Sequence, residues 1–176
     1  MSRIHGRSQL RAELLDISEL LTQVELGKIR VPDLQRAWRW DARDICDLFD
    51  SLWRGIPIGT LMMWRRSADA EILTFGPVQI TCPKRTDAWL VVDGHQRLIT
   101  LVGVLLSSRD DPDFQPFNLY FDLNAETWHQ STGTAPVDPA WLPLRVAHNS
   151  VRHSSGRAQT LSDERLVWPG GSVRRS

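Results

Sequence analysis

The stretch "LVVDGHQRLITLVGVLL", residues 90–106, joins two apolar patterns through a polar centre. Residues 88–92 are a short apolar run, which predicts a buried strand. From Leu98 to Leu106 the apolar side chains recur at helical spacing, which predicts a helix. We therefore expect the polar centre, residues 93–97, to lie at a strand-to-helix junction.

Two interpretations of this junction are open. The first turn of a helix presents unpaired N–H groups and the positive end of the helix dipole, so it attracts anions. Gly94 would let a ligand approach the backbone, and Arg97 could bind phosphate oxygens through two nitrogens. Alternatively, Asp93 only caps the helix, Gly94 relieves a turn, and Gln96 and Arg97 face solvent. The residues alone do not decide between a phosphate cradle and an ordinary helix start.

Two further helices are expected before the junction. Segment 16–29 has apolar residues at helical spacing, with Ser18 as its expected N-cap and Gly27 as its end. Segment 41–53 has the clearest helical pattern in the chain, and Asp41 can cap it. Each helix has one apolar face to bury.

Three more strands are expected. Residues 61–64 form a continuous apolar run, which predicts a second buried strand. Residues 65–88 are interrupted by glycine and proline, so we expect mainly loop there, with one strand near residues 78–81. Residues 117–123 predict a strand with alternate side chains on one face, namely Phe117, Leu119, Phe121 and Leu123.

Length and composition limit the classes of protein. The 176 residues suffice for one domain, which we place at 1–150, and the segment 151–176 is rich in Ser, Gly and Arg and is expected to be a poorly ordered tail. Lys plus Arg and Asp plus Glu each number 21, so the net charge gives no general argument for nucleic acid. The two cysteines lack metal-ligand spacing, which fits a reducing cytosol and predicts no metal site built by the protein. No apolar run approaches the roughly 20 residues of a membrane span, so we expect a cytoplasmic protein.

A second polar segment, "VPDLQRAWRW" at residues 31–40, also combines charge with aromatic rings. Trp38 and Trp40 could stack on a nucleobase while Arg36 holds a phosphate. An edge segment whose tryptophans cover the core is an equal alternative. The chain has no P-loop pattern, so phosphate chemistry of the Walker type is excluded.

The order of these pieces resembles the N-terminal domain of the GmrSD-type restriction-enzyme family, whose hallmark is a strand-to-helix junction reading Asp-Gly-Gln-Gln-Arg. The resemblance runs from about residue 16 to about residue 144. His95 stands where the hallmark has its first glutamine, and an imidazole can protonate near neutral pH. Two further family segments are matched by Pro32, Asp33, Gln35 and Arg36, and by Ser51, Gly55, Pro57, Ile58 and Gly59.

The layout is also similar to that of ParB-like proteins. This resemblance implies an α/β (α+β) chain of the ParB/sulfiredoxin-like kind, with a small mixed sheet flanked by helices. It implies nucleoside-triphosphate hydrolysis, with Mg²⁺ as the expected cofactor, in restriction of phage with modified DNA. The implied catalytic residues are Asp93, His95, Gln96 and Arg97, and the implied nucleotide- and phosphate-binding residues are Gln35, Arg36, Gly94 and Arg97.

Related proteins continue into a long helical region, and complete restriction enzymes add a histidine-based nuclease domain. The resemblance therefore implies a partner subunit that supplies these parts, with nucleotide and DNA as further partners and no membrane. The alternative is a non-catalytic module that binds a nucleotide or DNA without turnover.

Overall fold

The computed structural model describes residues 11–32, 39–107, 116–131 and 138–145. Gln35, Arg36 and Trp38, and the expected tail 151–176, lie outside these residues. The described helices are α1 (Ile17–Glu25), α2 (Ala42–Trp53) and α3 (His95–Leu105). The described strands are β1 (Ile29–Arg30), β2 (Met62–Ala68), β3 (Glu71–Phe75), β4 (Val78–Cys82), β5 (Arg85–Asp93), β6 (Leu119–Asp122), β7 (Thr127–Gln130) and β8 (Trp141–Pro143).

Side-chain caps set where the first two helices begin. Asp16 accepts a hydrogen bond from the N–H of Glu19 at 2.7 Å, so α1 is capped by Asp16 and the expectation of Ser18 was wrong. At α2, Asp41 accepts from the N–H of Asp44, and the Asp44 carboxylate accepts from the N–H of Asp41. This reciprocal capping box fixes the start of α2.

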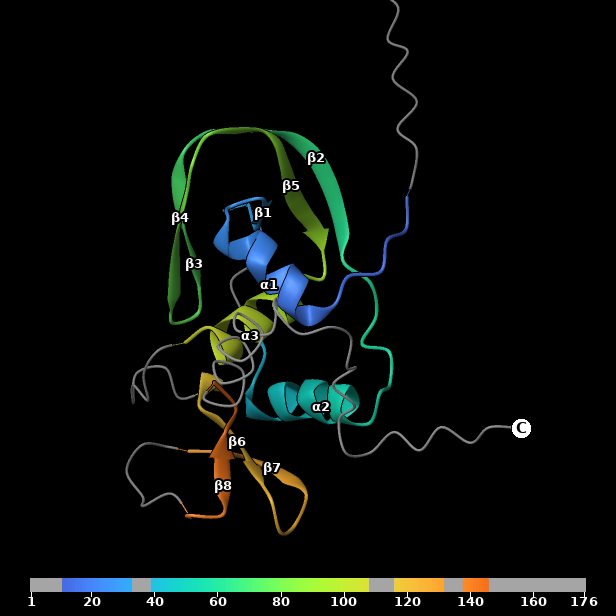
Figure 1. Cartoon of the computed structure of the whole chain (residues 1–176), viewed down its shortest axis with the longest axis vertical. Helices are drawn as coiled ribbons and strands as arrows, with labels where there is room; N and C mark the ends of the chain where they lie inside the picture. Colours follow the sequence, from blue (N-terminus) through green and yellow to red (C-terminus); the bar gives the residue numbers. More distant parts are fainter. Residues whose placement is uncertain (1–10, 33–38, 108–115, 132–137, 146–176) are drawn as a thin grey trace, which may run out of the picture.

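A small mixed sheet and a hairpin form the upper part of the molecule in Figure 1. β5 pairs with β1 in parallel and with β2 in antiparallel, in the order β1–β5–β2. β2 and β5 run on into the antiparallel β3–β4 hairpin, so the four strands make one long ribbon that arches over α1 and β1 (Figure 1). The expected small mixed sheet is confirmed, and the chain is α+β.

A second, antiparallel sheet, ordered β7–β6–β8, packs on α2. The contact is aromatic, because Phe49 of α2 lies 5.8 Å from Trp128 and Trp53 lies 4.7 Å from Phe121, measured between ring centroids. Such tilted ring pairs stabilise a contact beyond the area they bury. α2 is therefore one of the elements that attach the lower sheet to the rest of the domain.

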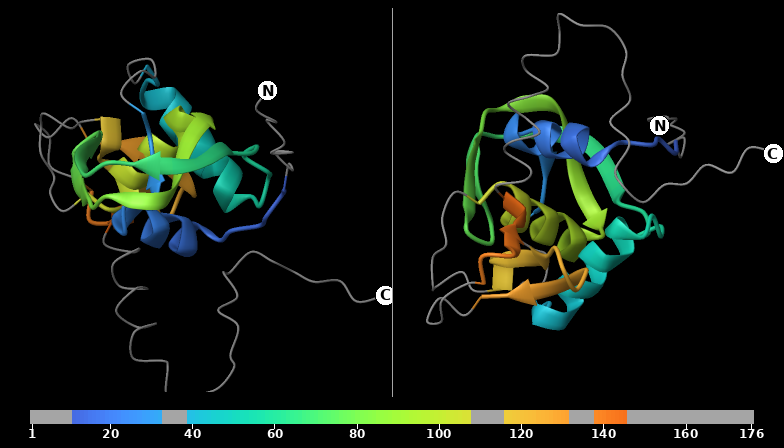
Figure 2. Two further views of the ribbon diagram at one scale, coloured as in Figure 1. Left: turned by 90° about the horizontal axis from the view of Figure 1, so that it is seen from above. Right: turned by 60° about the horizontal axis from the view of Figure 1, so that its bottom comes forward.

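Helix α3 occupies the middle of the domain, between the arching ribbon and the lower sheet (Figure 2). Every residue from Leu98 to Leu105 is buried, so the helix is covered on all sides. Only an apolar helix tolerates that position, since a polar side chain there would need a buried partner. The junction at its N-terminus is thus held by the most buried element of the fold.

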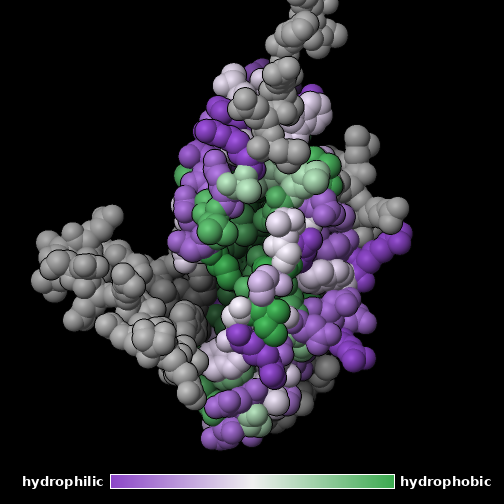
Figure 3. Space-filling model, turned by 90° about the vertical axis from the view of Figure 1, so that its right-hand side faces the viewer, coloured by the Kyte–Doolittle hydropathy of each residue, from purple (hydrophilic) through white to green (hydrophobic). Residues whose placement is uncertain are grey.

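The expected strands formed, but their burial was partly mispredicted. Met62 and Trp64 of β2 are 54 and 59 % exposed, so the expectation that residues 61–64 are buried was wrong. The reason is position, because β2 pairs with β5 on one side only. On the side of the molecule where β2 lies, hydrophobic residues gather along the middle and hydrophilic residues border them (Figure 3). β5 likewise alternates between buried and exposed residues instead of being buried throughout.

Candidate functional site

The junction has the geometry that its sequence predicts. β5 ends at Asp93, α3 begins at His95, and Gly94 between them has φ +86° as the helix N-cap. That backbone angle favours glycine, because a Cβ would be strained there. The N-cap of α3 is Gly94 and, in the part of the chain that the structure describes, no side-chain cap is recorded, so the alternative in which Asp93 serves as the helix cap is wrong. Because Gly94 has no side chain, the residue at the N-cap offers no acceptor of its own to the first-turn N–H groups of α3.

Arg97 connects the junction to the loop between α2 and β2. Its Nη1 donates to the carbonyl of Ile58 at 3.1 Å and to that of Thr60 at 2.8 Å. The loop passes very close, since a Cβ on Gly59, which has φ +90°, would lie 2.7 Å from Nη1. A Cβ on Gly94 would lie 3.4 Å from the other terminal nitrogen, Nη2. One nitrogen of Arg97 therefore holds the loop, and the other lies beside the helix start.

Gln96 connects the junction to the end of the second polar segment. Its Oε1 accepts from the N–H of Arg39 at 3.0 Å, and its Nε2 lies 3.0 Å from the Nε2 of His95. Gln35 and Arg36, which precede Arg39, fall outside the described residues, so their implied role in binding nucleotide and phosphate remains a prediction.

Asp93 presents an exposed side chain at the end of β5. Within the described residues, the structure records no hydrogen bond or ion pair to its carboxylate. The Asp93 oxygens are thus available to a ligand, a water molecule or a cation.

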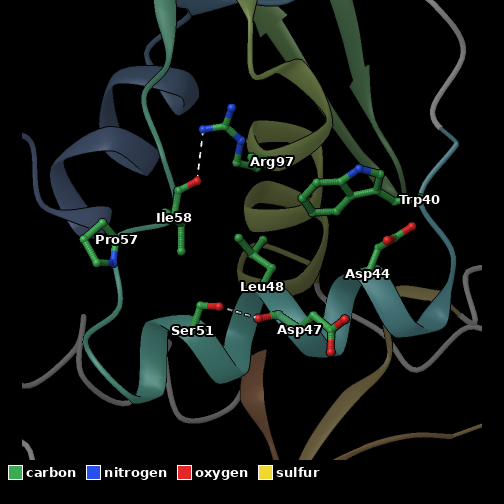
Figure 4. Close-up of a pocket in the computed structure, with 8 residues that line it drawn as sticks. All are labelled: Trp40, Asp44, Asp47, Leu48, Ser51, Pro57, Ile58 and Arg97. Carbon is green, nitrogen blue, oxygen red and sulfur yellow. Dashed lines mark hydrogen bonds between the residues drawn. The ribbon is translucent and has the colours of Figure 1, made fainter.

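A cavity of about 400 Å³ opens beside Arg97, between α2 and the loop (Figure 4). The guanidinium of Arg97 stands on one side of it, Asp44 and Asp47 of α2 on the other, and Leu48 points into the middle (Figure 4). The ring of Trp40 lies along the same opening. The remaining lining residues are Ser51, Pro57 and Ile58.

Sequence reasoning assigned the helix carrying Asp44, Asp47 and Ser51 to packing alone. The signal for a second role was present, because these polar residues are three and four positions apart and so share one helix face. That face borders the opening beside the loop and Arg97, and the side chains of Asp44 and Asp47 are also exposed to solvent. A cavity with a basic wall and an acidic wall suits a ligand that has both an anionic part and hydroxyl or amino groups.

The described residues include no group of three or more His, Cys, Asp or Glu side chains that could hold a metal ion. Both cysteines are free, and burial raises the pKa of the thiols of Cys46 and Cys82. Thiols kept protonated in this way are poor metal ligands. A metal at this site would therefore need oxygen atoms of a ligand in addition to protein groups.

Comparison with known proteins gives the junction its context. Residues 17–155 match the family model of the GmrSD restriction endonuclease, N-terminal domain. The chain belongs to this family. The matched range of this GmrSD N-terminal domain includes the junction at residues 93–97.

A relative of this GmrSD N-terminal domain is the uncharacterized protein MJ0686 of Methanocaldococcus jannaschii, 28 % identical over 130 residues. The match covers 66 % of this chain and 21 % of the relative, so the chain spans about a fifth of that protein's length. No solved structure matches the chain significantly. Among the described residues, no helix is long and apolar enough to cross a membrane.

Proposed function

We propose that this GmrSD N-terminal domain binds a nucleoside triphosphate at the β5–α3 junction and hydrolyses it within a system that restricts modified phage DNA. The observation that carries the proposal is the arrangement at Gly94. Three features lie within one turn of the chain there. The helix N-cap is a glycine, which has no capping side chain, Nη2 of Arg97 lies beside it, and the exposed carboxylate of Asp93 is one residue away.

The two walls of the cavity determine which way the nucleotide lies. Phosphates are repelled by Asp44 and Asp47, so they belong at the helix start, where N–H groups and Nη2 of Arg97 attract them. The nucleoside then extends into the cavity, where a base can stack on Trp40 and the carboxylates can accept from ribose hydroxyls. The cavity volume of about 400 Å³ falls in the usual range for small-ligand sites.

Asp93 is the residue to which we assign the hydrolytic step. In this proposal its carboxylate orients the attacking water and accepts its proton. Asp93 also fits Mg²⁺, which typically takes one or two carboxylates and completes its shell with phosphate oxygens and waters. When bound, the ion would neutralise charge on the phosphates. Gln96 positions the junction against Arg39, and His95 donates or accepts beside it.

A non-catalytic nucleotide-binding module is the second candidate, and one observation favours it. His95 replaces the first glutamine of the family hallmark and lies against Gln96, so the pair differs from the hallmark in the residues nearest Asp93. In both candidates the domain works with a partner that carries the helical and nuclease parts and acts on DNA. These parts would account for the length by which MJ0686 exceeds this chain.

Calorimetry and phosphate release test the proposal. We expect the wild type to bind at least one of ATP, GTP, CTP and UTP with Mg²⁺ and to release phosphate from it. Asp93→Asn should keep most of the binding and lose the release, because an amide cannot accept the proton of water. The control is Asp87→Asn on the same strand, which should retain both, since Asp87 pairs with Arg85 away from the junction.

Three outcomes are informative. Absence of nucleotide binding by the wild type contradicts both candidates. Binding without release, with or without added DNA, selects the non-catalytic module. Undiminished release by Asp93→Asn contradicts the role assigned to Asp93.

A further inference from the structure

The outer strand of the mixed sheet presents an aromatic and basic face that the nucleotide site does not use. β2 pairs with β5 on one side, and no described strand pairs with its other edge. Trp64 is 59 % exposed, Met62 54 % and Val92, at the end of β5, 51 %. None of the three lines the cavity beside Arg97. Trp64 and Val92 lie on the same face of the ribbon, because Leu90, the partner of Trp64, is two positions from Val92. Adjoining exposed apolar side chains commonly mark an interaction surface.

Two arginines of β2 each lie over a tryptophan, on opposite faces of the strand. Arg66 lies 5.4 Å from the ring centroid of Trp64, and Arg65 lies 5.8 Å from that of Trp89. Because side chains alternate along a strand, Trp64 and Arg66 share one face, and Arg65 with its partner Trp89 takes the other. An arginine lying over a tryptophan therefore occurs on each face of the ribbon.

The two faces differ in their acidic neighbours. Residues opposite Trp64 and Arg66 on β5 are Leu90 and Ala88, which carry no charge. On the other face Asp87 stands two positions from Trp89 and binds Arg85 at 3.1 Å. Arg66 has no ion pair with any described residue, so its charge on the Trp64 face is not compensated there. That face is attractive to anions, and the Arg65 face is less so.

We propose that the Trp64–Arg66 face binds single-stranded nucleic acid, with a base stacked near Trp64 and a backbone phosphate held by Arg66. Aromatic rings beside basic groups are the common means by which proteins hold unpaired strands. A duplex offers no open base face to an exposed ring, so an unpaired strand fits better. This function goes beyond the proposed nucleotide hydrolysis and uses separate residues.

The charge argues against a second copy of this chain as the occupant. Pairing two β2 edges would bring the arginines of both copies close together, and like charges across a strand pair are destabilising. Charged side chains on an edge strand are in fact a common means of preventing such pairing. A polyanion gains from the same arginines.

Fluorescence anisotropy with the full chain and a labelled 12-nucleotide thymidine strand tests the proposal, with the matching duplex in parallel. We expect the strand to bind more tightly than the duplex. Trp64→Leu should weaken binding by about tenfold, within the range for loss of one stacked base, while Trp64→Phe keeps most of it. Arg66→Ala should weaken binding clearly more than Arg65→Ala, the matched control one residue away. Arg66→Ala should also lower the salt slope by about 0.7, the value per phosphate of a single strand.

Several results would overturn the proposal. One such result is that the labelled single-stranded DNA does not bind at low salt. Another is that single-stranded and duplex DNA bind equally tightly. Equal effects of Trp64→Leu and Trp64→Phe on an otherwise folded protein would show that no base stacks on an aromatic ring at this position. Equal effects of Arg65→Ala and Arg66→Ala would show unspecific charge attraction. Circular dichroism checks the fold of each variant, and phosphate release, which none of these residues should alter, separates this surface from the nucleotide site.

Discussion

At the scale of the residue, Arg97 shows how a motif can serve two purposes. The sequence suggested a charge directed at a ligand. In the structure Nη1 is occupied by the carbonyls of Ile58 and Thr60, while Nη2 lies beside Gly94. The guanidinium therefore holds the loop in place and leaves its second nitrogen beside the helix start.

Arg97→Ala should therefore lower stability as well as nucleotide affinity. Two charged hydrogen bonds from a half-buried side chain predict a loss of about 1 to 2 kcal/mol in the free energy of unfolding. Arg97→Lys should restore only part of either property, because one ammonium cannot replace two separated nitrogens. Urea denaturation and calorimetry measure the two effects. Arg54→Ala is the control, since Arg54 forms only an exposed pair with Asp50 and should change stability by less than about 0.5 kcal/mol. Unchanged stability of Arg97→Ala would contradict this account.

The sequence located the junction correctly but could not reveal what the arginines of this chain bind. Arg30 in β1 is the clearest example, because its side chain is fully buried in a strand of two residues. It donates to the carbonyls of Gly27 and Asp69 at 2.9 and 2.6 Å, to the carbonyl of Pro83, and to Glu71 at 2.9 Å. Backbone acceptors distant in sequence leave no pattern of residue types, so neither Arg30 nor the loop contacts of Arg97 could be predicted.

At the scale of the element, the helices were predicted better than the strands. Helical spacing over 9 to 12 residues in α1, α2 and α3 is a long signal. The strand expected near residues 78–81 is confirmed as β4, but its partner β3 was taken for loop. Gly76 and Pro77 suggested an interruption, yet they form the two-residue turn of a hairpin in which Phe75 pairs with Val78. The alternating burial of β3 and β4 was present in the sequence, though each run is only five residues long.

The turn between β6 and β7 depends on one ionised carboxylate, which predicts a pH effect. Hydrogen bonds from the N–H groups of Ala125 and Asn124, at 2.9 and 2.8 Å, hold the pKa of Asp122 below its usual value of 3.8. A lowered pKa means that Asp122 stabilises the fold fully above pH 3.8, and that this contribution is lost as the pH falls through the pKa of the folded state. We expect Asp122→Asn to be less stable than the wild type at pH 6, and the difference to shrink below about pH 4. Urea midpoints of both proteins from pH 6 to pH 3 measure it, and a constant difference over that range would contradict it.

At the scale of the whole molecule, the two sheets share one core. A single cluster of buried residues includes side chains of α1, α2, β3, β4 and α3, and also Leu119 of β6. The lower sheet additionally packs on α2 through Phe49 and Trp53. How the lower sheet packs on α2 was not predictable from the sequence, because short strands do not specify which helix they will pack against.

A continuous core of this kind predicts that the upper ribbon and the lower sheet unfold together. Far-UV circular dichroism and tryptophan fluorescence should then give the same urea midpoint, which is the usual sign of a two-state transition. Val102 is fully buried in α3, the helix that lies between the arching ribbon and the lower sheet (Figure 2). Val102→Ala should lower the free energy of unfolding by about 2 kcal/mol through the lost methyl groups and the space they leave, and it should move both midpoints equally. If the lower sheet were an independent unit, the two probes would separate in the variant, because the destabilised helix would release the ribbon while the Phe121–Trp128 contact persisted.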